Sequence, residues 1–335
     1  MNILLTSVGR RSYLVKYFRD ALNGDGLVHA ANSQYSPALQ FADRTIITPL
    51  IYNDDYIDFL LEYSMNNSIS AITPSFDIDL PVLAKAKNIF KEHGVHVLVS
   101  DHEVTQICND KWRSYAFFKE NGLNTPKTYL LVDDALHAIS KKEVKYPVII
   151  KPRWGMGSIG MFTAENDAEL TIFYERSKHE IMNTYLKYES GSDMDHSVLI
   201  QEMLIGPEYG LDVVNDLNKQ YITTLVKRKI AKRSGETYSA KTEDNPLLRE
   251  LGKRISHNLK HIAILDVDCI IVEDIPYVLE MNCRFSGMYP FSHIAGADLP
   301  LAIIQWLKGE TPRRELFEVK YGVAGIKDMA PMIIK

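Results

Sequence analysis

The sequence predicts an α/β protein whose first hundred residues form a doubly wound parallel sheet. Short apolar runs alternate with helical patterns there, and this alternation is typical of a parallel sheet covered by helices. Further along the chain, apolar runs come in pairs separated by short turns, which indicates antiparallel hairpins. The expected N-terminal strands are 2–8, 28–33, 45–49, 71–75 and 96–100, and the expected helices are 12–22, 54–67 and 79–94.

Composition excludes several classes of protein. The chain has 335 residues, 46% of them hydrophobic, and a net charge of −5, which argues against a general nucleic-acid or membrane-surface binder. Its cysteines (Cys108, Cys269 and Cys283) lack metal-ligand spacing and do not suggest a disulfide framework. The N-terminus lacks the apolar region of a signal peptide, and no run approaches the roughly 20 apolar residues of a membrane helix. We therefore expect a cytoplasmic protein with no nucleic-acid or membrane partner.

The first turn does not fit a dinucleotide-binding domain. It reads SVGRRS, with one glycine where that fingerprint needs three, and the second strand ends in Ala31-Asn32-Ser33 without an acidic residue. Gly9, Arg10 and Arg11 at a helix start either hold an anion or are solvated.

The stretch SFDIDLP (75–81) follows a strand at the edge where such sheets bind ligands. Asp77 and Asp79 are candidates to meet a substrate amine. Alternatively, Asp77 caps the next helix. The sequence leaves this choice open.

The stretch YPVIIKPRWGMGSIGMFTA (146–164) reads as a strand, a glycine-rich loop and a returning strand. The first strand delivers Lys151, and three glycines (155, 157 and 160) surround Ser158. Glycines permit positive φ and close approach, so the N–H groups of this loop could fold over a phosphate chain. The lysine precedes the glycines, unlike in the Walker P-loop, and an ordinary turn is the alternative.

The stretch VLIQEMLIGPEYGLDVV (198–214) reads as two strands around a Gly-Pro turn. An adenine needs a backbone donor–acceptor pair and apolar faces, which the strand end at 201–204 offers. A ribose needs a carboxylate acceptor, a role open to Glu208. A surface hairpin with ordinary charged residues is the alternative.

The stretch DVDCIIVEDIPYVLEMNCRFSG (266–287) reads as two strands joined by an acidic turn. Side chains alternate along a strand, so Glu280, Asn282 and Arg284 share one face, whereas Cys283 points to the core. Magnesium takes hard oxygen ligands, commonly one or two carboxylates plus substrate phosphates. Asp268, Glu280 and Asn282 meet that description.

The order of these motifs resembles the ATP-grasp superfamily, and within it the carbamoyl-phosphate-synthase-like ATP-grasp ligases. The motifs are NDKW, IIKPRWGMGSIG, QEMLIGPEYGLDV, VDCII and LEMNCRFSG. The resemblance implies a Rossmann-like (pre-ATP-grasp) domain over 1–105 and a two-lobed ATP-grasp α+β fold over 106–310. The lid of the ATP-grasp fold would span about 125–200, and a C-terminal segment, 311–335, would pack on the ATP-grasp domain.

The resemblance also implies ATP and Mg²⁺, or Mn²⁺ in its place, as cofactors. Arg284 and Lys151 would be catalytic, with Arg284 steadying the transferred phosphate. One of Lys227, Arg228 and Lys229 would contact phosphate. The implied nucleotide contacts are Lys111, Lys151, Gly155, Gly157, Ser158, Gly160, Gln201, Glu202, Met203, Leu204 and Glu208, and the implied metal ligands are Asp268, Glu280 and Asn282.

The activity that the resemblance implies is ligation of a small carboxylate to an amine through an acyl phosphate. The products would be an amide or peptide, ADP and phosphate, and a homodimer is expected from the family. One glycine loop and the absence of an internal repeat argue against complete carbamoyl-phosphate synthesis. Half of a split enzyme of that kind and a catalytically silent ATP-binding regulatory protein remain alternatives.

Overall fold

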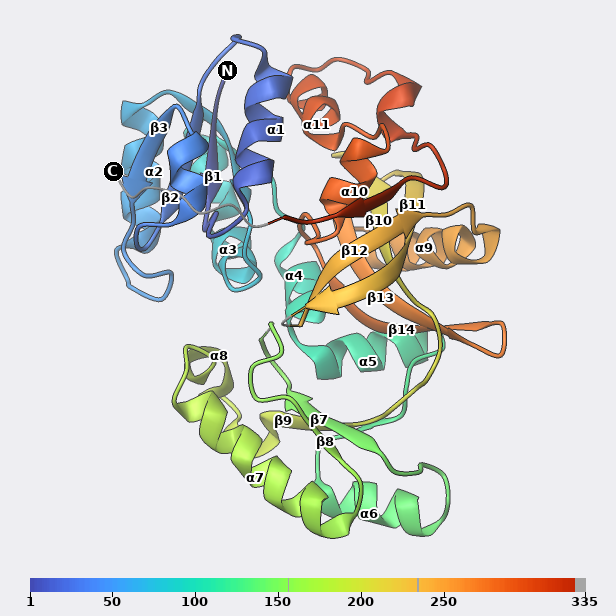
Figure 1. Cartoon of the computed structure of the whole chain (residues 1–335). Helices are drawn as coiled ribbons and strands as arrows, with labels where there is room; N and C mark the ends of the chain where they lie inside the picture. The colour runs from blue at the N-terminus through green and yellow to red at the C-terminus, as the bar shows by residue number, and fades with distance from the viewer. Residues whose placement is uncertain (156, 234, 329–335) are drawn as a thin grey trace.

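The computed structural model of the chain describes residues 1–155, 157–233 and 235–328 (Figure 1). Met156 of the glycine-rich loop and residues 329–335 of the expected C-terminal segment lie outside the described residues. Within these ranges no helix is both long and apolar enough to cross a membrane.

The N-terminal sheet is parallel throughout, as the strand–helix alternation predicts. Its strand order is β3-β2-β1-β4-β5, so the direction of winding reverses at β1. The loops after β1 and β4 therefore meet at the edge where doubly wound sheets bind ligands. The strands are β1 (Asn2–Thr6), β2 (Val28–Asn32), β3 (Arg44–Ile47), β4 (Ile69–Pro74) and β5 (His96–Val97), and the helices are α1 (Ser12–Leu22), α2 (Tyr56–Asn66) and α3 (Asp79–Glu92).

Two short helices follow this sheet. They are α4 (His102–Asn109) and α5 (Lys111–Glu120), and they meet at Asp110. The Asp110 carboxylate accepts hydrogen bonds from the backbone N–H groups of Trp112 and Arg113. This N-cap satisfies donors that a helix start leaves free, so α5 begins as a separate helix.

A six-stranded sheet of order β14-β13-β10-β11-β12-β15 forms the second layer; the pairs among these strands are antiparallel. Pro276 lies within the edge strand β14, where a residue without an N–H donor is tolerated. The strands are β10 (Glu208–Asn215), β11 (Tyr221–Arg233), β12 (Glu236–Thr242), β13 (Ile264–Val272), β14 (Ile275–Asn282) and β15 (Ala324–Ile326). The helices are α9 (Pro246–Leu259), α10 (Tyr289–Ile294) and α11 (Leu299–Leu307).

A smaller lobe, which we call the lid, carries a four-stranded antiparallel sheet of order β6-β9-β7-β8. Figure 1 shows it below the two larger sheets. It has its own hydrophobic core, which includes Val148, Ile150 and Leu170. Its strands are β6 (Thr128–Tyr129), β7 (Val148–Pro152), β8 (Phe162–Ala164) and β9 (Val198–Glu202), and its helices are α6 (Val132–Ser140), α7 (Asp167–Met182) and α8 (Lys187–Ser190).

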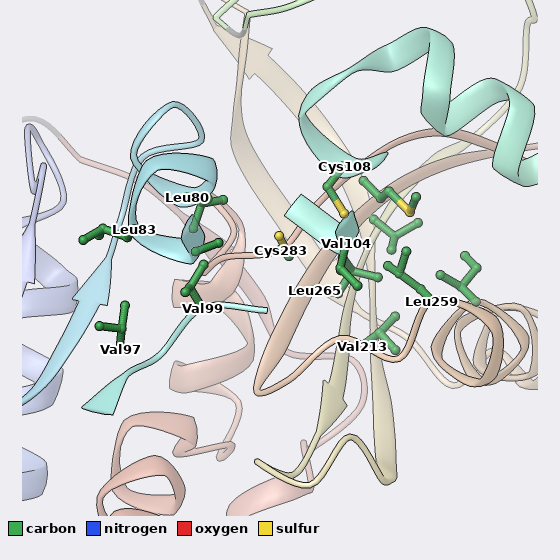
Figure 2. Packing of buried hydrophobic residues seen from close by; sticks show 14 of the residues in the cluster. Leu80, Leu83, Val97, Val99, Val104, Cys108, Val213, Leu259, Leu265 and Cys283 are labelled. Carbon is green, nitrogen blue, oxygen red and sulfur yellow. The ribbon is translucent and has the colours of Figure 1, made fainter. Parts of the chain in front are cut away.

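The two larger sheets share one hydrophobic core. Figure 2 shows Leu83 and Val97 on the N-terminal side, Leu265 on the antiparallel side, and Cys108 and Cys283 between them. A second cluster joins α1 to α11. Buried apolar side chains therefore run continuously from the first sheet to the second.

Candidate functional site

A cavity of about 1250 Å³ is lined by residues of the antiparallel sheet and the lid, and by the loops that follow β1 and β4 of the N-terminal sheet. Gly160, although in the glycine-rich loop, does not line it. The other catalytic, nucleotide-binding and metal-binding residues that the resemblance implies do, namely Lys111, Lys151, Gly155, Gly157, Ser158, Gln201, Glu202, Met203, Leu204, Glu208, Asp268, Glu280, Asn282 and Arg284.

The cavity floor is the β13–β14 hairpin. Asp268 is paired with Glu280 across the two strands, and Asp266 is paired with Asn282. Cys283 is buried in the shared core, as alternation predicts. Strand β14 ends at Asn282, yet Arg284 beyond it still lines the cavity. One face of this hairpin therefore presents carboxylate and amide oxygens to the cavity.

Lysines balance the carboxylates of the floor. Lys229 Nζ lies 2.8 Å from Asp268 Oδ1, and Lys111 Nζ lies 3.7 Å from Glu280 Oε1. Burial tends to raise the pKa of Glu280, but Lys111 and Lys151 outweigh it and hold that pKa below its usual value. Glu280 is therefore ionised at neutral pH.

The cavity floor offers a small number of oxygen ligands to a metal ion. Among the described residues, no group of three or more His, Cys, Asp or Glu side chains could hold one. Asp268 and Glu280 supply two carboxylates, and Asn282 adds an amide oxygen. That set fits a Mg²⁺ site in which substrate phosphates and water supply the remaining ligands.

Lys151 projects from β7 into the cavity and is almost fully buried. Its Nζ donates to Gln201 Oε1 at 2.8 Å, and Gln201 Nε2 donates to Thr128 Oγ1 at 2.9 Å. Burial lowers the pKa of Lys151 to about 8, against the opposing effect of Glu280. The Gln201 side chain, expected near an adenine, is thus engaged in orienting Lys151.

The structure discriminates among the three candidate cations on β11. Lys227 is fully buried and pairs with Asp212, and Arg228 is half exposed beside Glu243. Lys229 lines the cavity between Asp268 and Glu208. Although burial opposes it, Asp268 raises the pKa of Lys229. Lys229 is therefore the one positioned to contact a ligand there.

Arg284 is held by two aspartates, one in the loop after β4 of the N-terminal domain and one on β13 of the antiparallel sheet. Its Nε lies 3.0 Å from Asp77 Oδ1, and a terminal nitrogen lies 2.7 Å from Asp266 Oδ2. Burial raises the pKa of Asp266 to about 6, although Arg284 opposes this. Asp266 was missed from the sequence, but it lies two residues before Asp268, so alternation could have found it.

The two alternatives for Asp77 and Asp79 need correction. Helix α3 begins at Asp79 with no side-chain cap, so Asp77 does not cap it; it pairs with Arg284 instead. Asp79 is fully buried and accepts hydrogen bonds from the hydroxyls of Thr6 (2.5 Å), Ser7 (3.0 Å) and Tyr56 (2.8 Å). Asp79 therefore joins β1 to α2 and meets no substrate amine.

The glycine-rich loop lies between the lid and the other sheets. Gly155 has φ +115°, and a Cβ there would lie 2.4 Å from Leu186. Its carbonyl accepts a hydrogen bond from Lys111 Nζ at 2.5 Å. Trp154, beside it, is buried under the Arg153 guanidinium and does not line the cavity. The loop's conformation thus needs glycine, and its position is coupled to Lys111.

The lid also touches the N-terminal domain through α8. The rings of Tyr188 and Tyr52 stack with centroids 4.6 Å apart. Asn109 Nδ2 donates to Glu189 Oε1 at 2.5 Å. Burial raises the pKa of Glu189 to about 7. These contacts close the lid over one side of the cavity.

A parallel N-terminal sheet, an antiparallel sheet and a lid around one cavity define a class of two-lobed nucleotide-binding proteins. Residues 108–288 match the family described as ATP-grasp domain, and residues 3–98 match the family described as PylC-like, N-terminal domain. The chain belongs to the ATP-grasp family, as its motifs predict; the family consists generally of ADP-forming ligases.

Two relatives are carbamoyl-phosphate synthases. The enzyme of Methanobrevibacter smithii is 22% identical over 294 residues, which are 84% of this chain and 73% of that protein. The arginine-specific large chain of Geobacillus stearothermophilus is 25% identical over 66% of this chain. This chain spans only 21% of the length of that large chain.

Two solved structures share the fold. The biotin carboxylase domain dimer of Hydrogenobacter thermophilus 2-oxoglutarate carboxylase, in complex with MgADP, ADP and bicarbonate, has a TM-score of 0.74 at 19% identity. It matches 96% of this chain and 73% of its own. An L-amino acid ligase from Bacillus licheniformis has a TM-score of 0.71 at 17% identity, matching 92% of this chain and 75% of its own.

Proposed function

We propose that this protein is an ATP- and Mg²⁺-dependent carboxylate–amine ligase that acts through an acyl phosphate and releases ADP and phosphate. One observation carries the proposal. Three lysines (Lys111, Lys151 and Lys229) face the oxygen donors of the β13–β14 hairpin inside a single cavity. Cations for phosphates and hard oxygen ligands for Mg²⁺ are the two requirements of phosphoryl transfer.

Nucleotide binding would use the side of the cavity between the lid and the antiparallel sheet. Met203 and Leu204, between β9 and β10, would contact the adenine, and Glu208 would accept the ribose hydroxyls. Lys111, Lys151 and the glycine-rich loop would neutralise the phosphates. Asp268, Glu280 and Asn282 would hold Mg²⁺, which supplies charge neutralisation between the phosphates.

In the reaction, a carboxylate oxygen of the acceptor would attack the γ-phosphorus of ATP, and ADP would leave. The amine nitrogen would then attack the acyl carbon, phosphate would leave, and the nitrogen would lose a proton. Arg284, oriented by Asp77 and Asp266, would stabilise the charge that develops on the transferred group. The closed lid would keep water from the acyl phosphate.

The comparisons support this reading at the level of fold. Two of the similar solved structures are a biotin carboxylase domain in complex with MgADP and an L-amino acid ligase, both below 20% identity. Two of the sequence relatives are carbamoyl-phosphate synthases, which keeps a split enzyme of that kind as the second candidate. A homodimer belongs to the proposal because one solved relative is a dimer of such domains.

The test is ADP release over a panel of carboxylates and amines, comparing Lys151→Met with Lys145→Met. Lys145 is exposed on the same lobe and serves as the matched control. We expect Lys151→Met to lower turnover by about a hundredfold or more, as loss of a group that stabilises developing charge does, and the control to be near normal. ADP release that requires bicarbonate and ammonia would favour the split synthase. Tight ATP binding without turnover under any condition would favour a regulatory protein.

A further inference from the structure

The cavity extends past Arg284 into a second compartment, which we call the acceptor chamber. Its walls come from the start of α1, the loop after β14, helix α10, strand β12 and the segment at the end of β15. No motif in the sequence nominates the residues of the last of these. The start of α1, in contrast, carries Arg11, which the sequence offers as a possible anion-binding residue.

Arg11 places the chamber next to the reacting end of the cavity. One of its terminal nitrogens donates to the carbonyl oxygen of Phe285 at 2.6 Å. A terminal nitrogen of Arg284 donates to the same oxygen at 3.2 Å. Two guanidinium groups therefore converge on one carbonyl, and a group bound by Arg11 lies beside Arg284.

Lys327 brings a second cation into the chamber from the C-terminal side. Its backbone N–H donates to the carbonyl of Tyr238 at 2.9 Å, which continues the pairing of β15 with β12. Its ammonium lies 5.8 Å from the ring centroid of Phe291 and 3.8 Å from where a Cβ on Gly287 would be. This amine therefore lies directly over the loop after β14, within van der Waals reach of Gly287.

Two of the chamber's carboxylates, Glu236 and Asp266, have cationic partners other than Arg11 and Lys327. Burial lowers the pKa of Lys327, and the charged groups that act on it next are Glu236, Arg11, Asp266 and Arg10. Glu236 is paired with Arg10 at 2.8 Å, and Asp266 is paired with Arg284.

One further acid lines the chamber, Asp328, and it has an interaction of its own. The ion pairs of Glu236 and Asp266 are with Arg10 and Arg284, so neither of these two carboxylates is paired with Arg11 or Lys327. Each carboxylate whose partner is known is already matched. The chamber therefore presents two cations suited to an anionic ligand.

The opposite wall is apolar. Ile294 and Ile326 are 56% and 65% exposed, although both line the cavity. A Cβ on Gly325 would lie 2.8 Å from both Ile294 and Phe291, so β15 lies directly against α10. Large exposed apolar side chains grouped at a cavity mark a surface that a ligand or partner covers.

We propose, resting on the ligase function above, that the chamber binds the carboxylate acceptor and that this acceptor is an organic acid with a bulky apolar group. Arg11 and Lys327 bind its carboxylate beside Arg284. Ile294, Ile326 and the edge of Phe291 cover its hydrocarbon part. One carboxylate oxygen then faces the γ-phosphate, as the ligase reaction requires.

The test uses the full chain with ATP, Mg²⁺ and hydroxylamine, a small nucleophile that converts an acyl phosphate into a hydroxamate. Matched acids are compared in pairs: phenylalanine with glycine, and 4-phenylbutyrate with acetate. We expect the apolar member of the better pair to be favoured by about tenfold to a hundredfold in kcat/KM, which matches burial of one large apolar side chain. Equal or better use of the small acids would overturn the proposal.

Variants sharpen the test. Lys327→Met and Arg11→Met should each raise the KM of the apolar acid by about tenfold or more, as loss of a charged hydrogen bond does, with the KM of ATP changed less than about threefold. Lys327→Arg should restore most of the affinity. Lys320→Met, an exposed lysine of the same C-terminal segment, is the matched control. An unchanged KM in Lys327→Met would overturn the proposal.

Failure of the ligase function can be told apart from failure of this inference. If no acid yields hydroxamate or ADP, the ligase proposal falls, and binding of the acids is measured directly by calorimetry with a non-hydrolysable ATP analogue present. Binding of the apolar acid that Lys327→Met abolishes would still support the chamber. No binding of the apolar acid, or binding that the Lys327→Met substitution leaves unchanged, would overturn the assignment of the chamber.

Discussion

The lid and the N-terminal domain both border the cavity, but they are attached to the antiparallel sheet in different ways. The N-terminal domain shares a continuous apolar core with that sheet (Figure 2). The lid has a separate core, and side-chain contacts such as Tyr52 with Tyr188 and Arg153 with Asp110 link it to the rest. Polar and aromatic contacts can exchange for water at small cost, whereas a shared core cannot.

This difference divides the cavity into a fixed part and a movable part. The metal-ligand candidates, Arg284 and the acceptor chamber lie on the jointly packed sheets. Lys151 and the glycine-rich loop belong to the lid, which suits a cover that opens for a nucleotide. Five substitutions test that division, in order from the largest expected effect to the smallest.

Arg284→Ala should destabilise the jointly packed sheets by about 3–5 kcal/mol, because it leaves the buried Asp77 and Asp266 carboxylates without their partner. Urea unfolding measures this. The control is Arg314→Ala, whose pair with Glu318 is exposed, and which should change the free energy of unfolding by less than about 0.5 kcal/mol. Equally small changes in the free energy of unfolding for the two variants would show that Arg284 does not stabilise the packing of the N-terminal domain on the antiparallel sheet.

Leu265→Ala and Ile150→Ala each remove a buried side chain and should each cost about 3 kcal/mol, but in different places. Leu265 belongs to the shared core and Ile150 to the core of the lid. Hydrogen exchange resolved by segment should show faster exchange in β1, β4 and β13 for the first variant, and in β7 and β9 alone for the second. Faster hydrogen exchange in every segment of the Ile150→Ala variant would show that the lid and the shared core unfold as one cooperative unit.

Tyr188→Ala should weaken the docking of the lid by about 1 kcal/mol, since it removes one stacked aromatic pair. Global stability should hardly change. Spin labels at Ile172→Cys on α7 and Lys91→Cys on α3 would report the lid distance, because the three native cysteines are buried. A distance distribution identical to that of the unmutated protein would show that the stack does not hold the lid.

Glu189→Gln should change only the pH dependence of lid docking. Burial raises the pKa of Glu189 to about 7 from the usual 4.5, so the docked lid holds a proton that an undocked lid releases. Docking is then fully favoured below about pH 4.5 and weakens as the pH rises towards 7. With the same spin labels, the glutamine variant should lose this dependence, and a slope that persists would place the titrating group elsewhere.

The local sequence pattern predicts which face of a strand a side chain occupies, but it does not predict contacts between residues that are far apart in the sequence. The strand period places Glu280 and Asn282 towards the cavity and Cys283 in the core, because alternation depends only on the strand itself. The pairing of Arg284 with Asp77 joins residues far apart in sequence, and no local rule supplies it. Likewise, Lys327 reaches the cavity only because β15 pairs with β12.

The charges around the β13–β14 hairpin already satisfy one another, with Lys229 on Asp268 and Lys111 near Glu280. Under the proposed function, a magnesium nucleotide entering this site would exchange those partners: the lysines would turn to phosphate, and the carboxylates would turn to the metal. Such an exchange would leave the number of unpaired charges nearly unchanged. Binding of a nucleotide to an open basic cleft, in contrast, pairs lysines and arginines that had no partner before. Added salt screens exposed charges most, so nucleotide affinity should fall only weakly as ionic strength rises. A steep fall between low and physiological salt would show that the lysines are not engaged before the nucleotide arrives.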